Sequence, residues 1–153
     1  MAELKEGDQI PGFELEGDDG KVYTPEDFKG DRLIIYFYPK DNTPGCTVEA
    51  KDFTALTEDF GRLGYKVVGV SPDKTATHCR FKEKHELGVL LLSDPEKEAA
   101  EAFGAYGEKK NYGKTYMGII RSTFAFDEGG KLIKSYKNVR ATGHAQRVLD
   151  DLS

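Results

Sequence analysis

The stretch RLIIYFYPKDNTPGCT, residues 32–47, decides how this sequence is interpreted. Residues 32–38 form a run of aliphatic and aromatic side chains, which is typical of a strand buried on both faces of a sheet. Pro39 ends the run, because proline cannot donate a hydrogen bond to a neighbouring strand. A short loop follows, and Pro44 favours the first turn of a helix. The stretch therefore predicts a strand, a loop and a helix whose first turn contains Cys46.

The first turn of a helix is a chemically special place for Cys46. Backbone N–H groups there have no intrahelical acceptor, and the positive end of the helix dipole lies close by. Both features favour the thiolate, which is the nucleophilic form of cysteine. Thr43 can offer a hydroxyl group from the loop to the same place. We interpret Cys46 as an activated nucleophile, although a small buried cysteine with only a packing role remains the alternative.

Length and composition limit the class of protein. A chain of 153 residues fits one domain over 1–153, and 38% hydrophobic with 32% charged residues is typical of a soluble globular protein. The longest apolar run, residues 33–38, is too short to span a bilayer. The N-terminal sequence MAELKEGDQI has no apolar signal segment, so we expect a cytoplasmic protein. The net charge of -5 and the lack of a basic stripe argue against nucleic acid as a partner.

The rest of the chain alternates between patterns of strands and helices. Alternation around an Asp/Gly turn predicts a hairpin over 13–24, and apolar periodicity predicts the remaining elements. We expect further strands at 65–71, 89–92, 119–126 and 131–136, and helices around 53–63, 74–87, 95–103 and 145–152. Residues 104–118, rich in glycine and tyrosine, are predicted to form a loop. This order predicts an α/β protein with the thioredoxin fold, in which helices flank a central mixed sheet extended by an N-terminal hairpin.

Several motifs resemble one family of proteins. The segment Pro39-x-x-x-Thr43-x-x-Cys46 resembles the active-site motif of peroxiredoxins. The longer string YFYPKDNTPGCTVEA, residues 36–50, resembles the peroxiredoxin Q or bacterioferritin comigratory protein subfamily of the AhpC/TSA superfamily. Residues 113–124 are similar to that subfamily's segment G-K-x-Y-x-G-I-x-R-x-T-F. Because several motifs match in order, the resemblance covers essentially the whole chain.

The resemblance implies a thiol-dependent peroxidase that acts in antioxidant defence and reduces hydrogen peroxide and organic hydroperoxides. Cys46 matches the peroxidatic cysteine, which becomes a sulfenic acid and is recycled by a dithiol such as thioredoxin. Thr43 matches a hydroxyl that contacts thiolate and peroxide, and Arg121 matches an arginine that holds both. Pro39 matches a residue that shields the pocket, and Glu49 one that orients the arginine. The resemblance implies a monomer, with a dimer as the alternative, and no cofactor or metal is expected.

The sequence departs from the family at the second cysteine. Many members carry a resolving cysteine five positions after the peroxidatic one, where this chain has Lys51. Others carry it in the next helix, at a place that corresponds to Lys82. Cys79 lies one turn earlier, so either Cys79 resolves the sulfenic acid or the enzyme works with one cysteine. The neighbouring His78 and His85 are interpreted as surface residues, because their spacing does not suit a metal site.

Two other functions remain as alternatives. A disulfide oxidoreductase is disfavoured, because Glu49 stands where a C-x-x-C motif would need its second cysteine. A holdase chaperone or a redox-sensing module on the same fold is the alternative from another class. Peroxide consumption with a dithiol reductant separates these functions from a peroxidase.

Overall fold

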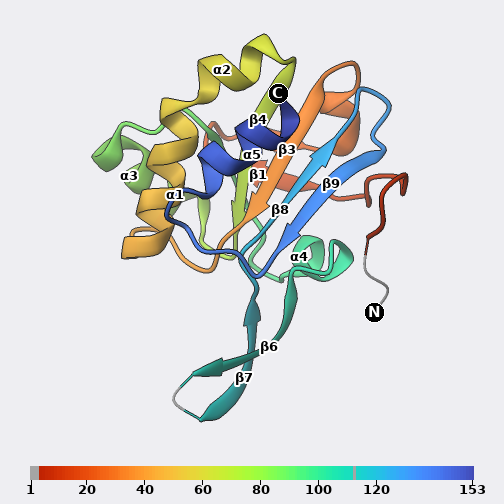
Figure 1. Ribbon diagram of the computed structural model, residues 1–153. Helices are drawn as coiled ribbons and strands as arrows, with labels where there is room; N and C mark the ends of the chain where they lie inside the picture. The colour runs from red at the N-terminus through yellow and green to blue at the C-terminus, as the bar shows by residue number, and fades with distance from the viewer. Residues whose placement is uncertain (1–3, 112) are drawn as a thin grey trace.

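The computed structural model describes residues 4–111 and 113–153, and its centre is a mixed sheet with the strand order β2-β1-β5-β4-β3-β8-β9 (Figure 1). The strands of this sheet are β1 (Leu15–Gly17), β2 (Val22–Tyr23), β3 (Arg32–Phe37), β4 (Tyr65–Ser71), β5 (Leu90–Ser93), β8 (Ser122–Phe126) and β9 (Leu132–Lys137). The helices are η1 (Pro25–Phe28), α1 (Pro44–Ala55), α2 (Thr57–Arg62), α3 (Thr75–His85), α4 (Glu98–Ala102) and α5 (His144–Leu152).

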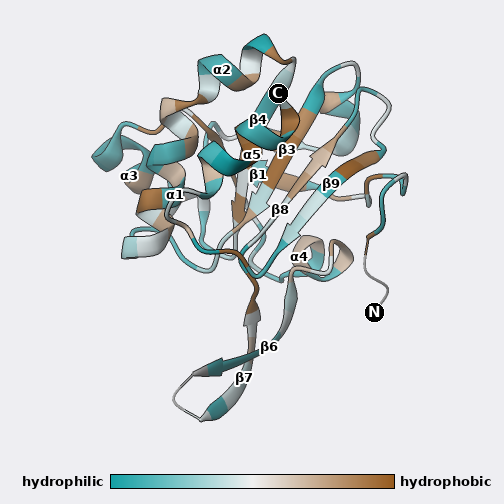
Figure 2. Ribbon diagram, viewed as in Figure 1, coloured by the Kyte–Doolittle hydropathy of each residue, from teal (hydrophilic) through white to brown (hydrophobic). Residues whose placement is uncertain are grey.

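Strand β3 lies in the middle of the sheet and is buried on both faces. It pairs in parallel with β4, where Ile35 is opposite Val68, and antiparallel with β8, where Ile35 is opposite Phe124. One face of β3 contributes to an apolar cluster with α1, α3 and α5, and the other face to a cluster with η1 and α4. Figure 2 shows the hydrophobic colouring of these central strands. The prediction of a central mixed sheet flanked by helices is confirmed.

The N-terminal hairpin is also confirmed, and it extends the sheet. Leu15 pairs with Tyr23, and β1 continues the sheet by pairing antiparallel with β5. The helical pattern at 53–63, by contrast, belongs to two helices. Leu56, with φ -103° and ψ 6°, separates α1 from α2. The apolar spacing continues across this break, because both helices pack on the same cluster.

The prediction of a loop at 104–118 is wrong. Strands β6 (Tyr106–Asn111) and β7 (Lys114–Ile119) form an antiparallel hairpin that projects from the body of the molecule (Figure 1). Most of β7 is exposed, so neither face of the hairpin needs the alternation of apolar and polar residues that identifies a half-buried strand. Tyr116 and Met117 on β7 are among the large apolar side chains exposed to solvent.

Both apolar clusters contain side chains of β3, which supports one folding unit; that the chain forms a single domain stays a prediction. Within residues 4–111 and 113–153, no helix has the length and apolar composition needed to cross a membrane.

Candidate active site

The candidate site lies where β3 ends and α1 begins. Cys46 is in the first turn of α1, and its side chain is buried, with 2% of the residue exposed. Thr43 is the extended residue that precedes the helix, and the N–H of Thr47 donates to its carbonyl oxygen at 2.8 Å. The N–H groups of Gly45 and Cys46 come before this first helical bond, and the side chain of Thr43 does not cap them. They are therefore available to a ligand beside the sulfur.

Arg121 holds the sulfur of Cys46 from the segment between β7 and β8. Its Nη2 donates to Sγ of Cys46 at 3.3 Å, and its Nη1 donates to Oε1 of Glu49 at 2.5 Å. Burial opposes the charge of Arg121, but the negative charges of Glu49 and Cys46 outweigh it and raise the pKa of the guanidinium above its usual value. A positive charge therefore lies against the sulfur of Cys46, which is the setting typical of reactive cysteines.

Glu49 is one helical turn after Cys46 and is fully buried. Burial raises the pKa of Glu49 to about 7, although Arg121 acts in the opposite direction. Oε1 is bonded to Arg121, whereas Oε2 has no hydrogen-bond partner among the described residues. The hydroxyl of Tyr36, which is also buried, has none either within that part of the chain. The charge of Glu49 thus changes near neutral pH while its carboxyl group stays attached to Arg121.

Thr43 and Pro39 lie in the loop that leads to Cys46. The Thr43 hydroxyl donates to the carbonyl oxygen of Lys40 at 2.9 Å, so its oxygen keeps lone pairs that can accept from a peroxide O–H. Pro39 is half-buried and follows Tyr38, whose N–H donates to Val70 of β4 at 3.1 Å. The loop therefore begins directly after Tyr38, which is still hydrogen-bonded to the sheet.

Gly45 is part of the site in a way that the sequence did not indicate. A Cβ atom at this position would lie 3.2 Å from Nη2 of Arg121, which is closer than side chains normally approach. Glycine therefore allows the guanidinium to reach the sulfur of Cys46. The contact joins residues that are far apart in the chain, so no local pattern could reveal it.

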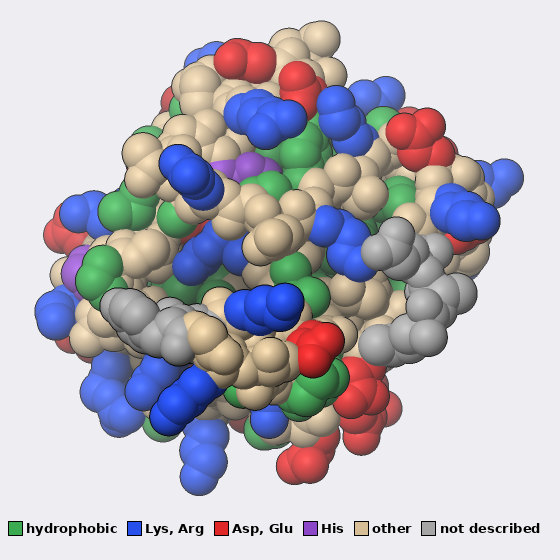
Figure 3. All heavy atoms as spheres, turned by 60° about the horizontal axis from the view of Figure 1, so that its bottom comes forward, with side chains coloured by type: hydrophobic (Ala, Val, Ile, Leu, Met, Phe, Trp, Pro, Cys, Tyr) green, Lys and Arg blue, Asp and Glu red, His purple; other side chains and the backbone are tan. Residues whose placement is uncertain are grey.

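Lys109 of the β6–β7 hairpin is a second residue that sequence reasoning missed. Burial and the nearby positive charge of Arg121 lower the pKa of Lys109, which indicates that its ammonium group lies close to the site. A cleft of about 490 Å³ includes Ile120, the residue before Arg121, and is lined by Glu108, Lys109, Lys110, Ile120, Lys137 and Asn138. Figure 3 shows this end of the molecule, where Lys and Arg side chains gather. Because residues 104–118 are predicted to form a loop, no sequence pattern places Lys109 near the site.

Cys79 does not contact Cys46. It is exposed on α3, and its Sγ donates to the backbone oxygen of Asp18 in the β1–β2 turn at 3.1 Å. Lys82 is on the same face of α3, with its Nζ 3.1 Å from Oδ2 of Asp18. The position occupied by Cys79 and the position at which the family carries its resolving cysteine are therefore neighbours on one helix surface.

The interpretation of His78 as a surface residue is wrong. Its side chain is completely buried, and its Nδ1 lies 2.6 Å from Oδ2 of Asp41. His85 is partly exposed, but its Nε2 is 3.0 Å from Oδ1 of Asn42. Asp41 is separated from His78 by 37 positions, so the sequence does not reveal the buried partner that satisfies this histidine.

A buried thiol beside a fixed guanidinium, on a thioredoxin-like sheet, defines a thiol-based enzyme of the thioredoxin fold. Comparisons with known proteins narrow this class. The sequence model of the AhpC/TSA family matches residues 6–135. Peroxiredoxin Bcp of Bacillus subtilis is 49% identical over 146 residues, which cover 95% of this chain and 93% of that protein. Peroxiredoxin Bcp of Escherichia coli is 41% identical over 150 residues, which cover 98% of this chain and 96% of that protein.

Solved structures agree with these relatives. A structure of Xanthomonas campestris bacterioferritin comigratory protein, studied for its alkyl peroxide reduction activity, superposes with a TM-score of 0.86 at 39% identity, covering 92% of this chain and 89% of that chain. A structure of Xylella fastidiosa PrxQ gives a TM-score of 0.92 at 31% identity, covering 99% and 97%. The chain therefore belongs to the AhpC/TSA family, and within it to the Bcp or peroxiredoxin Q group of thiol-dependent peroxidases.

Proposed function

We propose that Cys46 is the peroxidatic residue of this peroxidase, and that Arg121, Thr43 and Glu49 assist it. The Cys46 thiolate attacks one oxygen of the peroxide, so that an S–O bond forms while the O–O bond breaks. The leaving oxygen takes a proton and departs as water or an alcohol, and Cys46 becomes a sulfenic acid. The observation that carries the proposal is the hydrogen bond of 3.3 Å from the Arg121 guanidinium to the Cys46 sulfur.

The surroundings of the sulfur suit the charge that develops in this step. Negative charge grows on the leaving oxygen, and fixed donors that face that position lower the barrier. Arg121 and the free N–H groups of Gly45 and Cys46 are such donors. The Thr43 hydroxyl can accept from the peroxide O–H and thereby orient it. The role proposed for Pro39 is to cover the pocket, and the role proposed for Glu49 is to orient the guanidinium.

Organic hydroperoxides are included in the proposal, beside hydrogen peroxide. The cleft lined by Ile120, the residue before Arg121, offers room for a substituent larger than a proton. Exposed apolar side chains lie on the hairpin that forms one wall of this cleft, with Met117 opposite Glu108 and Tyr116 opposite Lys109. They supply a surface for an alkyl group. The alkyl peroxide reduction activity of the Xanthomonas campestris relative agrees with this choice.

For recycling, we propose that Cys79 resolves the sulfenic acid and that a dithiol such as thioredoxin reduces the product. The Cys79 thiol would condense with the sulfenic acid, forming a disulfide and releasing water. The shared face of Cys79 and Lys82 on α3 supports this role. The first turn of α1 must open first, because Cys46 is buried whereas Cys79 bonds to the β1–β2 turn. A one-cysteine cycle with an external thiol is the alternative.

A monomer in a reducing, cytoplasmic compartment completes the proposal. The large apolar side chains exposed within the described residues are Val22, Val48, Tyr116 and Met117, which belong to three separate elements instead of one wide patch. Both cysteines are free thiols, as a reducing compartment favours. Sedimentation of the reduced and the oxidised protein tests the monomer, and cell fractionation tests the compartment.

Turnover is the direct test of the function. The purified protein should consume hydrogen peroxide and cumene hydroperoxide when thioredoxin, thioredoxin reductase and NADPH are supplied, and it should stop doing so when thioredoxin is omitted. Failure with thioredoxin but activity with a small dithiol would contradict only the choice of reductant. Absence of peroxide turnover with every dithiol, together with suppression of aggregation of a heated client protein, would favour the chaperone alternative.

A further inference from the structure

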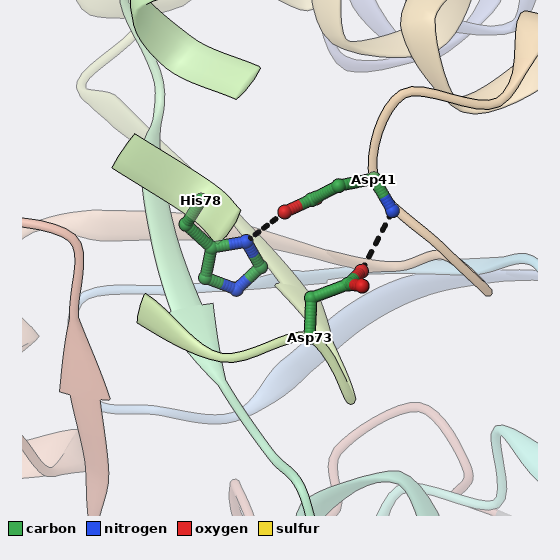
Figure 4. Close-up of side chains that lie close together, drawn as sticks. All are labelled: Asp41, Asp73 and His78. Carbon is green, nitrogen blue, oxygen red and sulfur yellow. Dashed lines mark hydrogen bonds and ion pairs between the residues drawn. The ribbon is translucent and has the colours of Figure 1, made fainter. Parts of the chain in front are cut away.

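A buried polar cluster lies beside the candidate site and has no part in the proposed chemistry. It contains Asp41, from the loop before α1, together with His78 from α3 and Asp73 from the segment after β4 (Figure 4). The carboxyl group of Asp41 points at the ring of His78, while its backbone nitrogen faces the carboxylate of Asp73. Asp41 and His78 are both almost fully buried, so each contact has to satisfy a polar group that water does not reach.

Both ring nitrogens of His78 have hydrogen-bond partners. Nε2 lies 2.9 Å from the backbone oxygen of Leu92, which can only accept, so Nε2 carries a proton. Nδ1 lies 2.6 Å from Oδ2 of Asp41, and the hydroxyl of Tyr38 donates to Oδ1 at 2.6 Å. The contact with Asp41 is therefore a short hydrogen bond between two buried side chains, and Tyr38 occupies the other oxygen of the carboxyl group. Loss of either partner would leave the other buried without its bond.

The cluster is organised for hydrogen bonding and not for a metal ion. The ligand atoms of Asp41, Asp73 and His78 lie within 4.8 Å of one another, a spacing that could suit a cation. However, Nδ1 of His78 is already paired with Asp41. Oδ2 of Asp73 accepts from the N–H of Asp41 at 2.6 Å and from the hydroxyl of Ser71 at 2.8 Å. A cation would have to break these bonds to use the same atoms.

The segment that this cluster holds is the loop that presents the reactive residues. Asp41 precedes Asn42, which has a left-handed backbone with φ 62°, and Asn42 precedes Thr43 and the first turn of α1. A left-handed residue other than glycine raises the free energy of the loop, so contacts from outside must stabilise this shape. His78 bonds to Asp41, and His85, two turns later on α3, bonds to Asn42. Two histidines of α3 therefore hold two consecutive residues of the loop.

We propose that His78 is a positioning residue for the peroxide step: through Asp41 it fixes the loop that sets Thr43 and the first turn of α1 around Cys46. The inference rests on the proposed role of Cys46. When the Asp41–His78 bond is lost, the loop samples more open shapes. Reaction with peroxide slows, because it needs the closed arrangement. Reaction of the sulfenic acid with a bulky reagent becomes faster, because it needs the open arrangement.

Two substitutions at His78 test this bond, because each new side chain places an amide nitrogen near the position of one ring nitrogen of histidine. The side-chain nitrogen of Asn is the same number of bonds from Cβ as Nδ1, whereas that of Gln matches Nε2. His78→Asn therefore keeps a donor for Asp41 and loses the bond to Leu92, and His78→Gln does the reverse. Both variants are made in a Cys79→Ser background, so that only Cys46 can react. His85→Ala removes the more exposed contact and serves as a third variant.

Two rates are measured well below each unfolding temperature. The first is the rate of Cys46 oxidation by hydrogen peroxide. The second is the capture of the sulfenic acid by dimedone, which forms a thioether and releases water. His78→Gln should slow oxidation roughly tenfold and speed capture, since small displacements of reacting groups have effects of this size or larger. His78→Asn should stay closer to the parent in both rates. His85→Ala should change both in the same directions by less.

The two histidine variants together keep the proposal falsifiable. The proposal would be overturned if His78→Asn and His78→Gln slowed the oxidation of Cys46 equally and the slowing followed only the fall in unfolding temperature. His78 would then have a purely structural role. Unchanged rates in His78→Gln would overturn it as well. If one of the two His78 variants does not fold, the other is compared with His85→Ala. The proposal predicts that oxidation slows while capture by dimedone becomes faster, so two rates that both fall or both rise would contradict it. A parent protein whose Cys46 does not react with peroxide would refute the proposed function itself, which is a separate result.

Discussion

The two cysteines of this chain have opposite hydrogen-bonding roles. Cys46 is buried in the first turn of α1, and its sulfur accepts a hydrogen bond from the charged guanidinium of Arg121 at 3.3 Å. Cys79 is exposed on α3, and its sulfur donates to a neutral carbonyl oxygen of Asp18 at 3.1 Å. A cationic donor beside the sulfur is the setting typical of reactive cysteines, whereas a neutral carbonyl oxygen is not.

This difference shows that exposure alone does not identify a reactive thiol. Cys79 is the more accessible of the two, but the polar atom beside its sulfur is the neutral carbonyl oxygen of Asp18. Cys46 is only 2% exposed, so it is poorly accessible to bulky reagents, but a charged guanidinium lies beside its sulfur. This difference supports the proposal that the peroxide step belongs to Cys46 and that Cys79 acts only after the first turn of α1 has moved.

The largest expected effect follows from exchanging the sulfur at each position. Cys46→Ser should lower peroxide turnover by roughly 10³-fold or more, because a serine hydroxyl is not ionised at neutral pH. Cys79→Ser should leave the oxidation of Cys46 by the first equivalent of peroxide unchanged. Stopped-flow measurement of peroxide consumption in both variants checks these two predictions. Turnover that survives in Cys46→Ser would mean that the comparison has the cysteines reversed.

The next effect concerns the positive charge of Arg121, which lies beside the sulfur of Cys46. Arg121→Ala should slow the peroxide step by about 10²- to 10³-fold, the usual cost of removing a fixed donor from a developing negative charge. Arg62→Ala, on the exposed surface of α2, is the matched control and should keep the parent rate. The rate constants for hydrogen peroxide are compared at one pH. An Arg121 variant as fast as the Arg62 variant would remove the physical basis for preferring Cys46.

A smaller effect is expected from Gly45→Ala. The new Cβ would lie 3.2 Å from Nη2 of Arg121 and would displace the guanidinium from the Cys46 sulfur by a fraction of an ångström. The peroxide step should slow about tenfold, while the fold remains intact. Gly61→Ala is the control, since a Cβ there meets no atom within 4 Å. Equal rates in the two alanine variants would show that the guanidinium has room to move.

These residues also show how far the sequence could lead. The strand at β3, the helix start at Pro44 and the family motif around Cys46 are local patterns, and the structure has the strand and the helix where the patterns predicted them. The contacts of Arg121 with Cys46 and Gly45 join parts of the chain about 75 positions apart, so only the motif pointed to Arg121. Lys109 and His78 were missed, because the hairpin lacks an apolar pattern and the partner of His78 lies in a distant loop.

The smallest expected effect is on stability and concerns the carboxyl group attached to Arg121. Burial raises the pKa of Glu49 from 4.5 to about 7. Between pH 4.5 and about pH 7, the carboxyl group of Glu49 therefore binds more protons in the folded protein than in the unfolded chain. The free energy of unfolding should therefore decrease as the pH rises from about 4.5 to about 7, and this slope should be weaker in Glu49→Gln. Urea unfolding across this pH range measures it. The exposed Glu58→Gln is the control, and identical slopes in the two variants would contradict the assignment.

The identity of the sulfur that is oxidised first decides between Cys46 and Cys79 as the nucleophile. Reduced Cys79→Ser and Cys46→Ser variants are each treated with one equivalent of hydrogen peroxide in the presence of dimedone, and their peptides are analysed by mass spectrometry. The account predicts a dimedone adduct on the peptide that contains Cys46 in the first variant, and an unmodified Cys79 in the second. An adduct on Cys79, with Cys46 left as a free thiol, would contradict the central claim that the buried, arginine-bound sulfur is the nucleophile.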